Sequence, residues 1–218
     1  MKLITFVFAL LIPTFALAGS YEDMEGALTR KDSATAIDLI KRGMDVNTVD
    51  RTGNTLLIQA MRQEIPELID FLLQRRARLN LRNRNGETAL SIAAYIGSLE
   101  YVKRLVEAGA EINFYGWPPL SYAAFNGHTP IVDYLLKRGA EIDATTESGS
   151  TALFFAARFG HIEAVKLLLK NEADPMVVNE NGETAVDWAM KSKQTDIEDL
   201  LRASGGRSGK SALIDMSK

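Results

Sequence analysis

Four glycines recur at regular positions along this chain, and their spacing constrains its fold more than any other feature. Gly53 and Gly86 are 33 residues apart, as are Gly149 and Gly182. The interval from Gly86 to Gly149 is 63 residues, which is two such periods with three residues missing. A fixed period of this length indicates stacked repeats, each packed against its neighbours, rather than a single closed core.

Each period reads as a tight turn followed by two short helices. In the clearest copy, Asn85-Gly86 is a strong two-residue hairpin signal because both residues tolerate positive φ. A first helix is expected to begin after Thr88, and a second helix near Leu99. Threonine recurs at the position where its hydroxyl can accept from unpaired backbone N–H groups and cap the first helix. The four threonines are Thr55, Thr88, Thr151 and Thr184.

These motifs resemble the ankyrin repeat over nearly the whole chain. The resemblance is carried by Gly86-Glu87-Thr88-Ala89-Leu90 with Ala93-Ala94, Gly127-His128 with Leu135-Leu136, Gly139-Ala140-Glu141-Ile142-Asp143, and Gly160-His161 with residues 165–169. It implies an all-α fold, an α-solenoid of about six stacked helix pairs with short β-hairpin tips. It also implies a module that binds other proteins and has no reaction centre.

The period divides the chain into units. We expect a signal peptide at 1–18, a repeat domain at 19–203 and a flexible tail at 204–218, which is rich in Gly, Ser and charge. Within the domain, the predicted units are an N-terminal cap at 20–49 and repeats at 50–82, 83–115, 116–145, 146–178 and 179–203. The fourth unit has lost three residues from its tip, where Phe114-Tyr115-Gly116-Trp117-Pro118-Pro119 stands.

Glycine is also expected to end the second helices. Gly43, Gly109 and Gly139 stand where the left-handed conformation is needed. Arg76 and Glu172 align with these glycines, so both are predicted to have positive φ. A non-glycine residue in that conformation costs about 1 kcal/mol.

The first eighteen residues have the pattern of an export signal. Lys2 precedes the mostly apolar stretch Leu3–Leu17, and Ala16-Leu17-Ala18 matches a signal-peptidase site. We expect cleavage after Ala18, a periplasmic or secreted protein, and contact with a membrane only through this segment. The alternative is an uncleaved N-terminal anchor. The net charge of −3 argues against a nucleic-acid partner, which requires a broad basic surface.

The sequence offers little material for catalysis. There are no cysteines, and the two histidines, His128 and His161, are one period apart. Equivalent positions in stacked repeats are separated by about 10 Å, the spacing of packed helices. That is too far for one zinc ion, whose ligands lie at about 2.1 Å. We therefore expect the histidines to tie turns together, with no catalytic residue, metal or cofactor. The alternative is a small hydrolase or metal-dependent enzyme that uses His128 and His161.

Two serines stand where the resemblance leads us to expect a histidine. In the family's Thr-Pro-Leu-His motif that residue follows the capping threonine by three positions; here Ser91 and Ser121 occupy it, which puts the usual hydrogen-bond network in doubt. A cluster of five arginines lies in the second and third units. It either binds an acidic partner or is a solvent-exposed edge of the stack. It consists of Arg75, Arg76, Arg78, Arg82 and Arg84.

The resemblance places partner recognition on the hairpin tips and on the exposed side of the first helices. Exposed aromatic residues flanked by arginines are typical of the centre of an interface. The predicted partner-binding residues are Arg84, Tyr95, Ile96, Tyr115, Trp117, Phe125, Asn126, Arg158 and Phe159. The alternative is that the shortened tip folds Phe114 and Trp117 down to cover the core.

The predicted function is therefore a non-catalytic scaffold outside the cytoplasm that recognises another protein through its concave face. Exported bacterial proteins of this type suggest, by analogy, a toxin antidote or a helper of a stress enzyme such as catalase. A virulence effector that is exported further and binds a host protein is a further alternative.

Overall fold

The computed structural model describes residues 14–209. Most of the predicted signal peptide, residues 1–13, and residues 210–218 of the predicted tail lie outside this range. Within it the chain forms twelve helices. They are α1 (Thr14–Thr29), α2 (Ser33–Lys41), α3 (Leu56–Gln63), α4 (Pro66–Gln74), α5 (Ala89–Ile96), α6 (Leu99–Glu107), α7 (Pro119–Phe125), α8 (Thr129–Lys137), α9 (Ala152–Arg158), α10 (Ile162–Lys170), α11 (Ala185–Lys191) and α12 (Thr195–Ala203).

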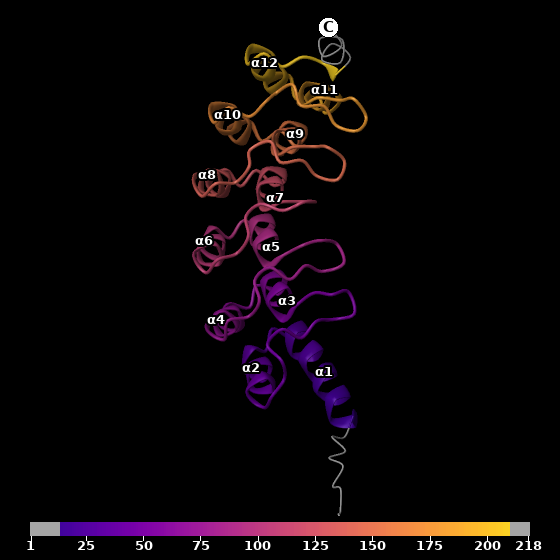
Figure 1. The fold of residues 1–218 in the computed structure, drawn as a ribbon, viewed down its shortest axis with the longest axis vertical. Helices are drawn as coiled ribbons and strands as arrows, with labels where there is room; N and C mark the ends of the chain where they lie inside the picture. The colour runs from indigo at the N-terminus through magenta and orange to yellow at the C-terminus, as the bar shows by residue number, and fades with distance from the viewer. Residues whose placement is uncertain (1–13, 210–218) are drawn as a thin grey trace, which may run out of the picture.

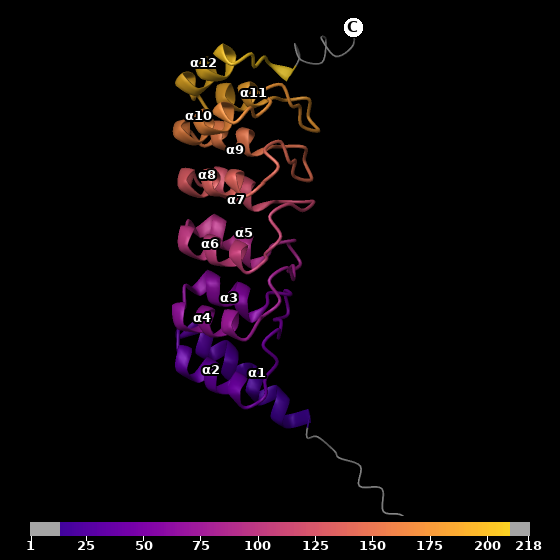
Figure 2. The same cartoon turned by 60° about the vertical axis from the view of Figure 1, so that its left-hand side comes forward.

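The helices form a single row of antiparallel pairs that runs from one end of the molecule to the other (Figure 1). The odd-numbered helices lie beside the loops, and the even-numbered helices lie on the other side of the stack (Figure 1). Both views show the connecting loops, which we call the tips, projecting along one edge (Figure 2). The prediction of an all-α solenoid of stacked helix pairs is confirmed. None of the described helices is long and apolar enough to cross a bilayer.

Packing between successive pairs produces one continuous core. Helix α5 packs against α3 and α7, and α9 packs against α7 and α11. Small side chains make this close approach possible, since Ala93, Ala123 and Ala156 are completely buried. A single cluster of buried apolar residues therefore extends from Met24 in α1 to Leu201 in α12.

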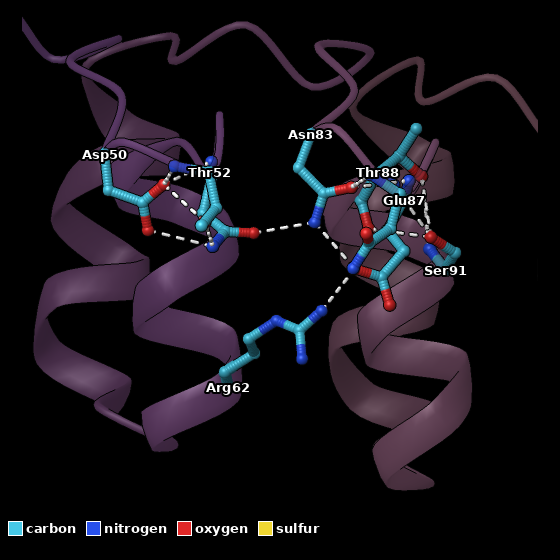
Figure 3. A network of polar contacts seen from close by, with 9 residues as sticks. Asp50, Thr52, Arg62, Asn83, Glu87, Thr88 and Ser91 are labelled. Atoms are coloured by element: carbon cyan, nitrogen blue, oxygen red, sulfur yellow. Dashed lines mark hydrogen bonds and ion pairs between the residues drawn. The ribbon is translucent and has the colours of Figure 1, made fainter.

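Among the described residues the tips are loops, with an isolated antiparallel bridge between Val49 and Thr55 and no paired strands. A polar side chain closes several of them from inside. The buried Asn83 accepts through Oδ1 from the backbone N–H groups of Asn85 and Glu87, both at 2.9 Å. Its Nδ2 donates to Asn54 Oδ1 of the preceding tip at 2.7 Å, which links neighbouring tips (Figure 3). Asp50 and Asn179 close their own tips in the same way.

A second set of side chains joins each repeat to the next one. These side chains lie in the segments that follow the second helices. In each case a side-chain oxygen accepts from a backbone N–H one repeat further along, at 2.8–3.1 Å. The acceptor–donor pairs are Asn47–Arg78, Asn80–Glu111, Asn113–Glu141 and Asp143–Asp174. These contacts make adjacent repeats depend on one another.

The two predicted exceptions to the glycine rule have the expected backbone. Arg76 has φ of 56° and Glu172 has φ of 67°, close to the 87° of Gly139 at the equivalent position. These side chains therefore sit in a conformation that only glycine adopts without strain.

Replacing Arg76 with glycine should raise the melting temperature, because it removes about 1 kcal/mol of left-handed strain. The matched control is Arg75→Gly. Arg75 has φ of −80°, so glycine there relieves no left-handed strain. It increases the entropy of the unfolded chain and removes the guanidinium whose carbon lies 5.1 Å from the Phe71 ring centroid. Thermal unfolding followed by circular dichroism tests both variants. A fall in melting temperature for Arg76→Gly would contradict the strain argument.

The shortened fourth tip changes how its first helix begins. In the third repeat, Thr88 and Ser91 form a capping box, in which each side chain bonds the other's backbone. In the fourth repeat Pro118 replaces the threonine, and the equivalent Ser121 Oγ is buried without a hydrogen-bond partner. The serine hydroxyl at this position is therefore hydrogen-bonded in the third repeat and has no hydrogen-bond partner in the fourth.

Ser121→Ala should stabilise the protein by about 1 kcal/mol, because it removes a buried hydroxyl that makes no hydrogen bond. Ser91→Ala should destabilise it by about 1 kcal/mol, because that hydroxyl caps α5. Urea unfolding of the two variants measures these opposite signs. Equal effects would mean that Ser121 finds a partner in solution.

At the C-terminal end, the start of the predicted flexible tail packs on the last repeat. Gly206 N–H donates to Leu201 O at 2.9 Å, and Thr184 Oγ1 donates to Arg207 O at 2.6 Å. Gly209 N–H reaches Asp187 Oδ2 at 2.6 Å. Residues 204–209 thus cover the beginning of α11.

At the other end, α1 begins before the predicted cap. It starts at Thr14, so the predicted cleavage site after Ala18 falls within this helix. The cap pair itself consists of α1 and α2, which pack against each other.

Candidate partner-binding face

Seven aromatic side chains form a continuous row across the first helices of the middle and C-terminal repeats. We call this set the aromatic row: Tyr95 (α5), Trp117 (fourth tip), Tyr122 and Phe125 (α7), Phe155 (α9), Phe159 (end of α9) and Trp188 (α11). Each ring has a neighbour in the row whose centroid lies 4.4–6.0 Å away. Offset and edge-on contacts at these distances are favourable for aromatic pairs.

Trp117 stands at the centre of the row. Its ring centroid lies 4.5 Å from that of Phe155, 5.2 Å from Tyr122 and 6.1 Å from Phe125. The fourth tip, which is three residues shorter than the others, places it there. The indole is half-buried, so it covers the joint between α7 and α9 and also offers a free surface.

Phe114, which with Trp117 was the alternative candidate for covering the core, lies outside the aromatic row. Its ring is under the guanidinium of Arg82, 4.2 Å from ring centroid to Arg82 Cζ. The shortened tip therefore folds Trp117 onto the first helices and holds Phe114 against the neighbouring repeat.

The predicted partner-binding residues separate into two groups. Tyr95, Trp117, Phe125 and Phe159 meet in the aromatic row, where Tyr95 is 44% exposed and Phe159 is 41% exposed. Arg158 joins them: its guanidinium carbon lies 4.8 Å from the Trp188 ring centroid and 5.5 Å from that of Phe159. Arg158 is exposed and forms no ion pair with any residue that the structure describes.

Four predicted residues have other surroundings. Ile96 is half-buried and packs against the core, and Asn126 donates through Nδ2 to Tyr95 O at 2.6 Å. Tyr115 is 77% exposed at its tip, and Arg84 is exposed at the preceding tip. Neither tip residue makes a ring contact with the aromatic row among the described contacts.

Three further members of this face were not predicted from the sequence: Tyr122, Phe155 and Trp188. They follow one another at 33-residue steps, so they occupy the same helical position in three consecutive repeats. An aromatic residue repeated at the period of the stack is the signal that could have found them. Phe155 is buried, whereas Tyr122 and Trp188 are half-buried. Trp117 contacts Tyr122 and Phe155, Phe125 contacts Phe155, and Phe159 contacts Phe125.

Paired charges border the face. Arg62 forms an ion pair with Glu87 on the N-terminal side, and Lys191 forms one with Glu183 on the C-terminal side (Figure 3 shows the first). The hydrogen bond from Lys191, together with one from Trp188 Nε1, lowers the pKa of Glu183 to about 2. Glu183 is therefore charged at neutral pH and fixes the Trp188 indole.

Burial has a matching effect within the row. It raises the pKa of Tyr122 to about 12, so this phenol is neutral at every pH at which the protein would be studied. The centre of the face is uncharged, and its only unpaired ionic group among the described members is Arg158.

The two histidines connect repeats instead of facing this surface. His128 Nε2 lies 3.0 Å from Tyr95 O, and His161 Nε2 lies 2.9 Å from Phe125 O, in each case in the preceding repeat. Gly97 and Gly127 leave room for the two rings. The described residues contain no group of three or more His, Asp or Glu side chains placed to hold a metal ion.

Comparison with known proteins gives matches over most of the chain. The family model described as "Ankyrin repeats (3 copies)" matches residues 64–146 and 120–210. A putative ankyrin repeat protein of Rickettsia bellii is 30% identical over 138 residues, 58% of this chain and 39% of that protein. The rat ankyrin repeat and SAM domain-containing protein 6 is 35% identical over 116 residues, 51% of this chain and 12% of that protein.

A third relative is the chicken nuclear factor NF-kappa-B p105 subunit, which is 30% identical over 135 residues, 58% of this chain and 14% of that protein. The matched segments thus cover 39% or less of the length of these three relatives. The similarity concerns the repeats and not the remaining parts of the larger proteins.

Proposed function

This chain belongs to the ankyrin repeat family, and we propose that it is a scaffold outside the cytoplasm that holds a partner protein against its aromatic row. Members of the family are generally non-catalytic modules that bind other proteins. The proposal adds to this the surface, the compartment and the type of contact.

The aromatic row carries the proposal. Its outer members Tyr95 and Phe159 remain more than 40% exposed, although they sit on a base of half-buried rings. A contiguous exposed apolar surface is uncommon on a monomer and marks a site of interaction. Large aromatic side chains with an arginine beside them are the residues that carry most binding energy in interfaces.

Arg158 gives the face a polar requirement. Its guanidinium is stacked on Trp188 and Phe159, so the side chain is already ordered before a partner arrives. Ordering in advance reduces the entropy lost on binding. We therefore expect the partner to place apolar side chains on the row and a carboxylate opposite Arg158.

The proposed location outside the cytoplasm is inferred from the first eighteen residues. A tagged full-length chain should appear in the periplasmic fraction or the medium of a Gram-negative host, with Gly19 at its N-terminus by mass spectrometry. Removal of residues 1–18 should keep it in the cytoplasm. A full-length chain that stays with the cytoplasm would overturn this part of the proposal. A toxin antidote and a helper of a stress enzyme are both roles that such a scaffold could fill.

The binding face is tested by affinity capture from a periplasmic extract, followed by measurement of binding to the purified partner. Tyr95→Ala/Phe159→Ala and Arg158→Glu should each weaken binding at least about tenfold, the equivalent of 1.4 kcal/mol. Tyr101→Ala, on the second helix α6, is the matched control and should leave affinity unchanged. Circular dichroism establishes that each variant is folded. Unchanged affinity in the first two variants would show that the partner binds elsewhere.

A further inference from the structure

Charged residues stand at one equivalent position of four tips, and their signs follow an order. Arg51 and Arg84 are 33 residues apart, Arg84 and Glu147 are 63 apart, and Glu147 and Glu180 are 33 apart. The intervals are those of the repeat, so the four side chains form one column along the tip edge. All four residues are exposed, and none forms an ion pair or a side-chain hydrogen bond within residues 14–209.

The centre of this column is the shortened fourth tip, where Tyr115 is 77% exposed. It borders a shallow hollow of about 360 Å³ that Asn113, Phe114 and Glu141 also line. Two arginine tips precede Tyr115 and two glutamate tips follow it. The column, with Tyr115 at its centre, is therefore basic in its N-terminal half and acidic in its C-terminal half.

We propose that the tip edge binds a second copy of this chain in antiparallel orientation, with a two-fold axis beside Tyr115. In that arrangement Arg84 faces Glu147 of the second copy, and Arg51 faces its Glu180. Two-fold symmetry repeats every contact, so each interface holds four ion pairs around a central pair of Tyr115 side chains. The proposal uses side chains outside the aromatic row and does not depend on the proposed function.

The order of charges selects this occupant. An antiparallel copy is complementary at all four positions, whereas a parallel copy would place arginine against arginine and glutamate against glutamate. An unrelated acidic protein would pair with the arginine tips and be repelled by Glu147 and Glu180. Like charges brought together at an interface cost several kcal/mol, and complementary ones fix its register.

Sedimentation equilibrium of residues 19–218 at low and high ionic strength measures the association. The wild type should form dimers at micromolar concentrations, and the dimer should weaken as salt is added, because exposed pairs are screened. Arg84→Glu and Glu147→Arg should each weaken the dimer about 100-fold, since each reversal creates two repulsive pairs. Tyr115→Ala should weaken it as well.

Mixing the variants gives the decisive result. An equimolar mixture of Arg84→Glu and Glu147→Arg restores both pairs, so two chains that are monomeric alone should form a heterodimer. The double variant Arg84→Glu/Glu147→Arg should form a homodimer for the same reason. Lys170→Glu is the control. This exposed lysine lies in the last turn of α10, away from the tips, so its replacement should leave the apparent mass of the dimer unchanged.

Circular dichroism shows whether the variants are folded, which is expected because all the altered side chains are exposed. A wild-type chain that stays monomeric at low salt would overturn the proposal. So would a dimer that survives both reversals, or folded variants whose mixture does not associate.

Discussion

Replacing Gly127 with alanine should lower the free energy of unfolding by about 3 kcal/mol, one of the larger effects that a single methyl group produces. Gly127 has φ of +70°, where an alanine costs about 1 kcal/mol. In addition, its Cβ would lie closer than 3.0 Å to the His161 ring. The ring must move or the backbone must shift.

The ring cannot move without a further loss. His161 Nε2 is 2.9 Å from Phe125 O, and this contact joins the fifth repeat to the fourth. Displacing the imidazole breaks the contact and leaves a carbonyl group unpaired between two repeats, at a cost of about 1–2 kcal/mol. Urea unfolding followed by circular dichroism measures the total.

Gly139→Ala is the matched control. Gly139 also has positive φ, 87°, but a Cβ there would meet nothing within 4 Å. It should therefore show the strain alone, about 1 kcal/mol. Adding His161→Ala to Gly127→Ala should recover the part of the cost due to the clash. Equal losses for Gly127→Ala and Gly139→Ala would mean that the ring yields freely.

The period of the chain predicted the stack because it is a property of backbone geometry. Each unit must bury the same faces against the same neighbours, so glycine, threonine and alanine recur at the turn, the cap and the close contact. The positive φ of Arg76 and Glu172 followed from alignment alone. The interpretation of His128 and His161 as ties between turns agrees with their contacts to main-chain oxygens of the preceding repeat.

The candidate site was harder to predict from the period, because it depends on the fourth tip, where the sequence departs from the repeat. The three missing residues place Trp117 over α7 and α9, and nothing in the spacing says in which direction a shortened loop folds. The rings of Tyr122 and Trp188 are half-buried and that of Phe155 is buried, so all three resemble core positions in any single repeat. Only their recurrence at 33-residue steps shows that they form one surface.

Phe154→Ala should cost about 4 kcal/mol, because it empties one of the largest fully buried side chains and leaves a cavity. Phe154 lies between the last two repeats, where its ring meets Trp188 edge-on at 5.4 Å between centroids. It occupies the position that Ser91 and Ser121 hold in other repeats. The prediction that the Thr151 side chain caps α9 is wrong, since it accepts no backbone hydrogen bond there. Phenylalanine offers no group that could bond this threonine, and Thr151 Oγ1 is buried without a partner. The apolar packing of the Phe154 ring compensates for the free energy lost by leaving this hydroxyl unpaired.

Phe159→Ala provides the comparison, since Phe159 lies at the end of the same helix and is 41% exposed. Its removal leaves no closed cavity, and stability should fall by no more than about 1 kcal/mol. The two substitutions remove the same atoms, so the difference between their free energies of unfolding isolates burial. Similar losses would show that Phe154 is less enclosed in solution than its 1% exposure indicates.

Phe154→Ala should also change the form of the unfolding curve. In a stack of repeats, stability is the sum of each repeat and its contacts with its neighbours, so weakening one contact uncouples the repeats beyond it. The sixth repeat, with α11 and α12, should then unfold at a lower urea concentration than the rest. In a Trp117→Phe background, the fluorescence of Trp188 reports this repeat alone, because the chain has two tryptophans. The fluorescence transition should precede the loss of helical signal in Phe154→Ala and coincide with it in the parent. Coincident transitions in both would mean that the contact between α9 and α11 does not limit the cooperativity of the stack.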